Sequence, residues 1–476
     1  MLVIWRRSGD LAASGSPERR GSPLHLTAGR VAVLAAVLYG LAVVSLQASG
    51  RLPLARAVSM VAAPAILALS AARPGWMLLA VLATPPGLLR QVPLLTPLAL
   101  GAVLTATVVL RWPATSERSS GALAFAPLAV LLALSIADRA AVGSLAASAA
   151  SQFRAELLLF AGTALITFVA VRDGSVSVRA IETSILVAVA GTAAIYLAQA
   201  GPHLERLTLW GPDAPADPGL LYHRTHFGYL AAMGFLVALS RSLLPERAGT
   251  RVAGSRVPAA LVAAGLAAVT ALSFTRGAWL ASIAGLLLIA GVARRRGPWL
   301  LVPALALLIV LVPVARERVA SDVEGGLAAS IRSGSFGSGR AELWGALSSR
   351  VGEEPVAGHG FGYAWTLTPE DLFDAPDQFV SPGNPFVYAH NDVLFWALEF
   401  GAIGAALWLL WWAALARAAV WVLRRALASA GLTGVLLVML VAETVDNGLF
   451  IRAIAVPAFA AAGALLALRP SARGSS

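Results

Sequence analysis

The feature that most limits what this chain can fold into is a series of apolar runs of about 16 to 20 residues, separated by short breaks that contain Arg or Pro. A helix of that length crosses the hydrocarbon core of a bilayer. A soluble helix would need polar residues at helical spacing on one face, and runs such as 300–314 carry none. Charged residues make up only 13% of the 476 residues, about half the share in a soluble protein. The sequence therefore predicts an all-α, polytopic integral membrane protein.

The apolar runs predict about twelve to fourteen transmembrane helices. The candidate spans lie at about 31–48, 54–72, 75–89, 93–110, 121–137, 155–171, 180–199, 226–241, 257–274, 277–293, 298–315, 392–416, 429–446 and 449–468. The chain then divides into a cytoplasmic tail (1–30), a transmembrane bundle (31–315), a long outer loop with short helices (316–390), C-terminal transmembrane helices (391–468) and a second cytoplasmic tail (469–476).

The orientation in the membrane follows from the arginines, which supply all 36 basic residues and leave a net charge of +11. In a soluble protein this charge would indicate nucleic-acid binding, but here the arginines lie mostly at the ends of apolar runs. With the N-terminus inside, 22 arginines face the cytoplasm and 14 face outward, five of them in the long loop. The positive-inside rule favours this orientation. We therefore expect membrane lipid as a partner, no nucleic acid, and residues 316–390 outside.

Two arginines on the outer side are candidates for phosphate binding. Arg276 lies in a short turn between two spans, beside Ser273 and Thr275. A bidentate guanidinium near the membrane surface suits a phosphate tethered in lipid, although a lone arginine at a helix end also snorkels to the interface. Arg340 and Trp344 share one face of a predicted short helix, which would aim Arg340 inward; a solvated loop arginine is the alternative.

His390 precedes the apolar helix expected over 391–404 and is the candidate general base, because imidazole titrates near physiological pH. A structural histidine in the loop is the alternative. Asn391 and Asp392 are good N-terminal residues for that helix. Glu399 follows Asp392 by seven residues and shares its face. An intramembrane carboxylate is usually paired or functional, and a structural bond to a neighbouring helix is the other interpretation.

A glycine run precedes this helix. Gly358, Gly360 and Gly362 do not follow a strand that opens a nucleotide-fold helix, which argues against a dinucleotide site. A tight turn that brings backbone close to a ligand or the membrane fits better.

Arg224 and His226 lie in a third outer segment and are further site candidates. His223 and His226 have helical spacing, but no further metal ligands stand near them in the sequence. We therefore predict no metal site and no cofactor.

Together these blocks resemble the O-antigen ligase and polymerase family of integral membrane glycosyltransferases. The matching blocks are Ser273-Phe-Thr-Arg276-Gly-Ala-Trp279, Gly339-Arg340 with Leu343-Trp344, Gly358-His-Gly-Phe-Gly362, and His390-Asn391 with Leu394, Glu399, Gly401 and Gly404. Their order, and the long outer loop before the last helices, also match. The motifs cover about 273–404, and the rest of the chain agrees in topology alone.

The resemblance implies an enzyme that transfers a glycan from a polyprenyl (undecaprenyl) pyrophosphate carrier to an acceptor on the outer face of the bacterial inner membrane. In that scheme Arg276 and Arg340 hold the pyrophosphate, and His390 activates or orients the acceptor hydroxyl. Trp344, Gly360, Gly362, Asn391, Asp392 and Glu399 support the site. No metal is needed, because the arginines neutralise the leaving group.

The acceptor remains open at this point. An O-antigen ligase, whose acceptor is the lipid A core, is the first interpretation, and a polymerase of O-antigen or exopolysaccharide is the alternative. A protein O-oligosaccharyltransferase shares the same motifs. A transporter of lipid-linked glycan is a more distant alternative, because transporters bind near the bilayer midplane and the charged residues here gather on the outer side.

Overall fold

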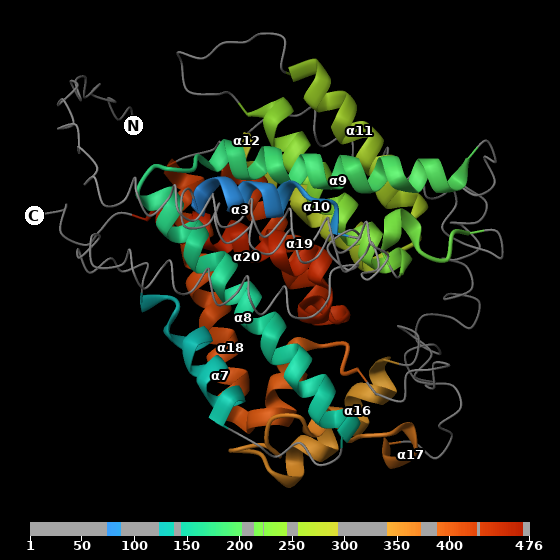
Figure 1. Ribbon diagram of the computed structural model, residues 1–476, viewed down its shortest axis with the longest axis vertical. Coiled ribbons are helices and arrows are strands. Elements are labelled where there is room, and N and C mark those ends of the chain that lie inside the picture. The colour runs from blue at the N-terminus through green and yellow to red at the C-terminus, as the bar shows by residue number, and fades with distance from the viewer. Residues whose placement is uncertain are drawn as a thin grey trace, which may run out of the picture. The chain divides into compact units, whose positions relative to one another are not determined.

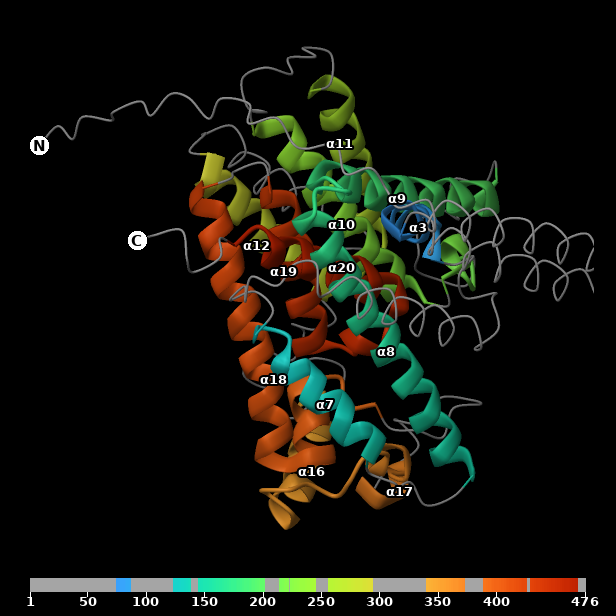
Figure 2. The same cartoon turned by 60° about the vertical axis from the view of Figure 1, so that its left-hand side comes forward.

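The computed structural model describes residues 74–86, 123–137, 144–201, 214–221, 223–244, 256–293, 340–372, 388–425 and 429–469. All of them belong to the compact unit of residues 73–476. Throughout these ranges the ordered elements are helices, and no strand occurs among them (Figures 1 and 2). The prediction of an all-α fold is therefore confirmed. The predicted spans at 31–48, 54–72, 93–110 and 298–315, the N-terminal tail, most of the C-terminal tail, and loop residues 316–339 and 373–387 lie outside the described residues.

The described helices overlap the predicted apolar runs, except for α16 and α17, which lie in the predicted loop 316–390. They are α3 (Pro74–Ala83), α7 (Ala126–Ala137), α8 (Ser144–Arg172), α9 (Val178–Ala200), α10 (Arg224–Leu243), α11 (Arg256–Leu272), α12 (Arg276–Ala293), α16 (Arg340–Glu353), α17 (Pro369–Leu372), α18 (Asp392–Arg425), α19 (Ala430–Val445) and α20 (Arg452–Ala467), with short 3₁₀ turns η3 (Pro218–Leu220), η6 (Tyr363–Trp365) and η9 (Gly448–Phe450). Of these, α8, α9 and α18 are long and apolar enough to cross a membrane, and α7, α11, α12, α19 and α20 are shorter apolar helices.

Close packing between α8 and α20 builds one side of the bundle. A side chain at Gly463 would lie only 2.1 Å from the carbonyl oxygen of Ala164, so only glycine fits there. At the start of α20, Arg452 forms a 2.6 Å ion pair with the buried Glu156 of α8. The other side is built by α10, which packs on α11, α12 and α19.

Helix α18 is the element on which the glycine loop, residues 358–362, is built. Asn391 caps it, because its Oδ1 accepts the N–H of Leu394 at 3.0 Å. The helix then breaks at Phe400 and Gly401, and Gly401 adopts φ 60° and ψ −150°. A break of this kind leaves backbone groups on both sides without their partners one turn away.

The glycine loop supplies the missing partners at this break. The N–H groups of His359 and Gly360 donate to the carbonyls of Leu398 and Glu399 at 3.1 and 2.9 Å. In return, the N–H groups of Ala402 and Ile403 donate to the carbonyls of Pro355 and Val356 at 2.8 and 3.4 Å. A side chain at Gly358 would lie 2.5 Å from the carbonyl oxygen of Glu399, so two backbones meet directly there. The glycine run thus approaches the backbone of α18.

Aromatic rings hold the loop down from the other side. Phe153 of α8 stacks on Phe450 at 4.5 Å between centroids and contacts Trp365 at 5.5 Å and Phe395 at 5.3 Å. These rings come from α8, η6, α18 and η9, so one apolar cluster fixes four elements to one another. Helix α16 lies beside α18 in both views (Figures 1 and 2).

Candidate active site

Helix α16 places Arg340 over the start of α18. Leu343 and Leu347 are buried at 3% and 1% exposure and turn one face of α16 toward the protein. On the same face, the indole N–H of Trp344 donates to the carbonyl of Ala389 at 2.9 Å, immediately before His390. These contacts agree with the sequence prediction that α16 packs against the rest of the protein.

His390 has a backbone conformation that few residues other than glycine adopt, with φ 49°. Its N–H donates to Oδ1 of Asn447 at 2.8 Å, which holds this conformation. Its ring Nδ1 lies 3.1 Å from Oδ1 of Asp446. The histidine is thus fixed by two consecutive residues of the turn between α19 and α20, while its side chain remains 33% exposed.

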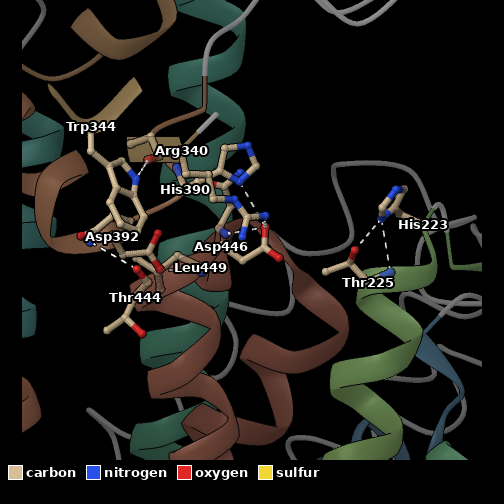
Figure 3. Close-up of polar contacts among 12 residues, drawn as sticks. His223, Thr225, Arg340, Trp344, His390, Asp392, Thr444, Asp446 and Leu449 are labelled. Carbon is tan, nitrogen blue, oxygen red and sulfur yellow. Dashed lines mark hydrogen bonds and ion pairs between the residues drawn. The ribbon is translucent and has the colours of Figure 1, made fainter. Parts of the chain in front are cut away.

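Asp446 joins the two functional groups that the sequence separates. The same Oδ1 that contacts His390 lies 3.4 Å from Nη2 of Arg340. Its side chain is only 12% exposed, whereas that of Arg340 is 29% exposed. Figure 3 shows Arg340 and His390 meeting on this carboxylate. The arrangement leaves a buried anion at the centre and a guanidinium and an imidazole at its edge.

The electrostatics of the cluster determine which nitrogen of His390 is basic. Burial by itself would raise the pKa of Asp446, but the hydrogen bond from His390 and the charges of Arg340 and His226 outweigh it and lower the pKa below its usual value. Asp446 is therefore ionised at neutral pH and can only accept hydrogen bonds. His390 consequently donates through Nδ1–H, which leaves Nε2 as the basic nitrogen.

Arg276 begins α12, directly after a tight turn. Ser273 and Thr275 are buried in this turn, and Phe274 has φ 51°. The indole N–H of Trp279 donates to the carbonyl of Thr270 at 3.0 Å and closes the turn. The turn therefore fixes the position of the Arg276 backbone. The Arg276 side chain is half-buried.

The start of α10 contacts this turn and also acts electrostatically on Asp446. A side chain at Gly228 would lie 2.5 Å from Oγ of Ser273, so α10 and the turn are in direct contact. His223 caps α10, with Nδ1 accepting the N–H of Thr225 at 3.2 Å (Figure 3). Burial and the charge of Arg224 lower the pKa of His223, which keeps it neutral. The charge of His226 acts on Asp446. The segment that carries Arg224 and His226 therefore belongs to the electrostatic surroundings of Asp446.

The remaining predicted residues divide into two groups. Asn391 and Asp392 stand next to His390: the Asn391 amide donates to the carbonyl of Thr444 at 3.3 Å, and Asp392 Oδ2 accepts the N–H of Leu449 at 2.9 Å. Both tie α18 to the turn that carries Asp446.

The second group lies at the break in α18. Glu399 is fully buried, and its oxygens accept the N–H of Gly362 and that of Ala364, the latter at 2.9 Å. Gly360 donates its N–H to the Glu399 carbonyl. These contacts shape the loop, and within the described part of the chain none of these hydrogen bonds runs to His390 or Arg340.

Sequence reasoning missed Asp446 and Asn447. A signal was present, because Asp446 ends the predicted span 429–446 and Asn447 follows it in the short break before the last span, on the side predicted to face outward. The same signal pointed to Arg276. A search of every predicted outer turn for hydrogen-bonding residues would have found them.

The described residues contain no group of three or more His, Asp or Glu that could hold a metal ion. The charges that could face an anionic substrate are those of the arginines described above and of the start of α12.

Comparison with known proteins adds one finding. Residues 259–409 match the model of the O-antigen ligase family. The match includes Arg276, Arg340 and His390, whereas Arg224, His226 and Asp446 lie beyond it. No curated protein matches the chain. The resemblance seen in the motifs is therefore confirmed over residues 259–409, the part of the chain that is similar to the O-antigen ligase family.

Proposed function

We propose that this protein is an O-antigen ligase that transfers a glycan from undecaprenyl pyrophosphate to a hydroxyl group of the lipid A core. The observation that carries the proposal is the meeting of Arg340 and His390 on one oxygen of Asp446, at 3.4 and 3.1 Å. A guanidinium, which is able to bind phosphate, thus lies beside an imidazole whose orientation a buried carboxylate controls. Glycan transfer from a pyrophosphate needs both groups at one place.

In the proposed mechanism, His390 acts as the general base. Its Nε2 removes the proton from the acceptor hydroxyl, whose oxygen attacks the anomeric carbon of the donor glycan. The bond from that carbon to the phosphate oxygen breaks, and the carrier pyrophosphate leaves with the electron pair. Asp446 stabilises the imidazolium that forms. Because His390 is 33% exposed, the proton can then pass to solvent.

Arg276 and Arg340 are proposed to bind the pyrophosphate. A guanidinium presents two parallel N–H groups to phosphate oxygens and keeps its charge at all relevant pH values. Two such groups would neutralise the negative charge that develops on the leaving pyrophosphate. We therefore propose a reaction that needs no metal ion and no cofactor.

We propose the bacterial inner membrane as the location, with the site facing the periplasm. Arginine bias supports this orientation, and the apolar helices support a membrane protein. Reporter fusions at Arg295 and Gly326, both outside the described residues, test it. The two fusions must report opposite compartments, and a shared compartment would contradict the proposed topology.

The acceptor is tested by deletion of the gene, followed by gel analysis of surface glycans. Loss of long chains on lipid A core, with carrier-linked polymer accumulating, is the result expected for a ligase. Products with single repeats would instead identify a polymerase, and unchanged lipopolysaccharide with loss of protein glycosylation would identify a protein O-oligosaccharyltransferase. Transfer by the purified protein from undecaprenyl-pyrophosphate donor separates all three from a transporter, which would show none.

A further inference from the structure

Tyr229 is a buried side chain without an assigned role. It lies on α10, three residues after His226, and its exposure is 0%. Its hydroxyl has no hydrogen-bond partner among the described residues. A buried hydroxyl that lacks a partner is unfavourable, and native proteins retain few of them. Tyr229 was not among the residues indicated by the sequence motifs.

The hydroxyl of Tyr229 points at the first turn of α12. A side chain at Gly277 would lie 1.9 Å from this oxygen, which means that the hydroxyl occupies the space that a residue other than glycine would fill. Gly277 follows Arg276, the first residue of α12. The first N–H groups of a helix lack intrahelical partners and attract anions. The hydroxyl is therefore placed where a helix start and an arginine both favour negative charge.

Charges from the other half of the site reach the same hydroxyl. Asp446 and Arg340 both act electrostatically on Tyr229. Tyr229 thus contacts the turn that carries Arg276 and also lies within the field of the Arg340–Asp446 ion pair.

We propose that the Tyr229 hydroxyl donates a hydrogen bond to a phosphoryl oxygen of the donor pyrophosphate, and that Gly277 keeps open the space this requires. The proposal rests on the proposed function and adds a neutral donor to its two arginines. The phenol supplies an O–H at a fixed position because the ring is held by burial, whereas the two arginine side chains are long and partly exposed. Tyr229 would then position the phosphate relative to His390 and leave charge neutralisation to the arginines.

The hydroxyl is covered in the structure, so donor binding must move a neighbouring group. Arg340 is 29% exposed and is held to Asp446 at 3.4 Å, longer than a strong ion-pair contact. Arg276 is also only half-buried. Both arginines are thus partly open to solvent, and the proposal requires a local side-chain movement beside the tyrosine when the donor binds.

The test uses Tyr229→Phe in the full-length protein, purified in nanodiscs. Because the hydroxyl has no partner without ligand, this variant should unfold at the same temperature as the wild type or slightly higher. Binding of undecaprenyl pyrophosphate should weaken about tenfold, the effect of losing a hydrogen bond to a charged group. Binding of inorganic pyrophosphate, measured in parallel, shows whether the effect belongs to the phosphates or to the lipid chain.

Two further variants make the result specific. Tyr196→Phe removes another buried tyrosine hydroxyl, from α9, where the ring packs on Phe227 at 4.9 Å; its donor affinity should equal that of the wild type. Gly277→Ala places a methyl group against the Tyr229 hydroxyl and should weaken donor binding by at least as much as Tyr229→Phe. This variant tests the same contact from the opposite helix.

The outcomes separate this inference from the function on which it rests. Tenfold weaker binding in Tyr229→Phe, together with weaker binding in Arg276→Ala and Arg340→Ala, supports both. Unchanged binding in a folded Tyr229→Phe variant, with weaker binding in the arginine variants, overturns the role of Tyr229 and leaves the proposed function standing. Unchanged binding in all three overturns both. Equal weakening in Tyr196→Phe also overturns the inference, because the effect would then not be specific to the site.

Discussion

Replacing Asp446 by Asn tests whether the carboxylate organises the site. The amide oxygen can still accept the Nδ1–H of His390 across the observed 3.1 Å, but a hydrogen bond without charge is about half as strong. The hydrogen bond between residue 446 and His390 is therefore weakened by roughly 1 kcal/mol. The partly exposed contact to Arg340, at 3.4 Å, contributes about 1 kcal/mol more. Together these losses of about 2 kcal/mol predict a roughly thirtyfold lower kcat/KM.

The assay is transfer by the purified protein from undecaprenyl-pyrophosphate-linked glycan to acceptor, with donor binding measured separately. Asp371→Asn is the matched control. Hydrogen bonds from Thr368, at 2.7 and 2.8 Å, lower the pKa of Asp371, and Asp371 contacts neither His390 nor Arg340 in the described structure. Replacing Asp371 should leave the transfer rate within about twofold of the wild type. The change weakens only a local helix cap and removes no contact with His390 or Arg340.

The double variant Asp446→Asn with His390→Ala gives the sharper test. If Asp446 acts partly through His390, then adding Asp446→Asn to His390→Ala should cost only the part that belongs to Arg340, about fivefold from 1 kcal/mol. Two fully additive effects would show that Asp446 does not act through the histidine. A single Asp446→Asn variant with wild-type kcat/KM would refute the reasoning altogether.

The same variant has a predicted pH dependence of stability. The pKa of Asp446 is lower in the folded protein than its usual value of 3.8, so the ionised form is favoured by folding. Its contribution is present above the unfolded pKa and is lost as the pH falls through the lower folded value. The melting temperatures of wild type and Asp446→Asn should therefore differ at pH 7 and converge below pH 3.8. A gap that keeps its size or widens as the pH falls below 3.8 would contradict this assignment.

Three further predictions concern the other groups. Arg276→Lys and Arg340→Lys keep the charge but lose the planar fork, so each should lower transfer at least about tenfold in the same assay; wild-type rates would contradict phosphate binding. His390→Ala should keep donor binding and lower turnover about a hundredfold, with partial activity in His390→Gln if orientation dominates, and EDTA should not affect the wild-type rate. Glu399→Gln should destabilise the protein by about 2 kcal/mol, seen as a lower melting temperature, because its N–H₂ would replace one of two accepting oxygens and face a backbone N–H; exposed Glu353→Gln is the control.

The sequence alone determined the helical class and the positions of the described helices. Apolar runs long enough to cross a bilayer must satisfy their backbone groups internally, and a helix does this with local hydrogen bonds. For that reason α8, α9 and α18 lie where hydropathy predicted them. The motif order also sufficed to indicate the family, because each motif is short and local: a turn before Arg276, a helix start at Arg340, and a cap beside His390.

Only the tertiary structure decided which of these residues act together. His390 and Asp446 are 56 positions apart and belong to different elements, so no periodicity in the sequence relates them. The glycine run was predicted to form a tight turn, and only the folded protein shows that its backbone replaces the hydrogen bonds lost at Gly401. Both outcomes depend on how α16, α18 and the turn after α19 pack against one another. Side-chain volumes and the break in α18 set that packing, and a local pattern of apolar and polar residues does not record it.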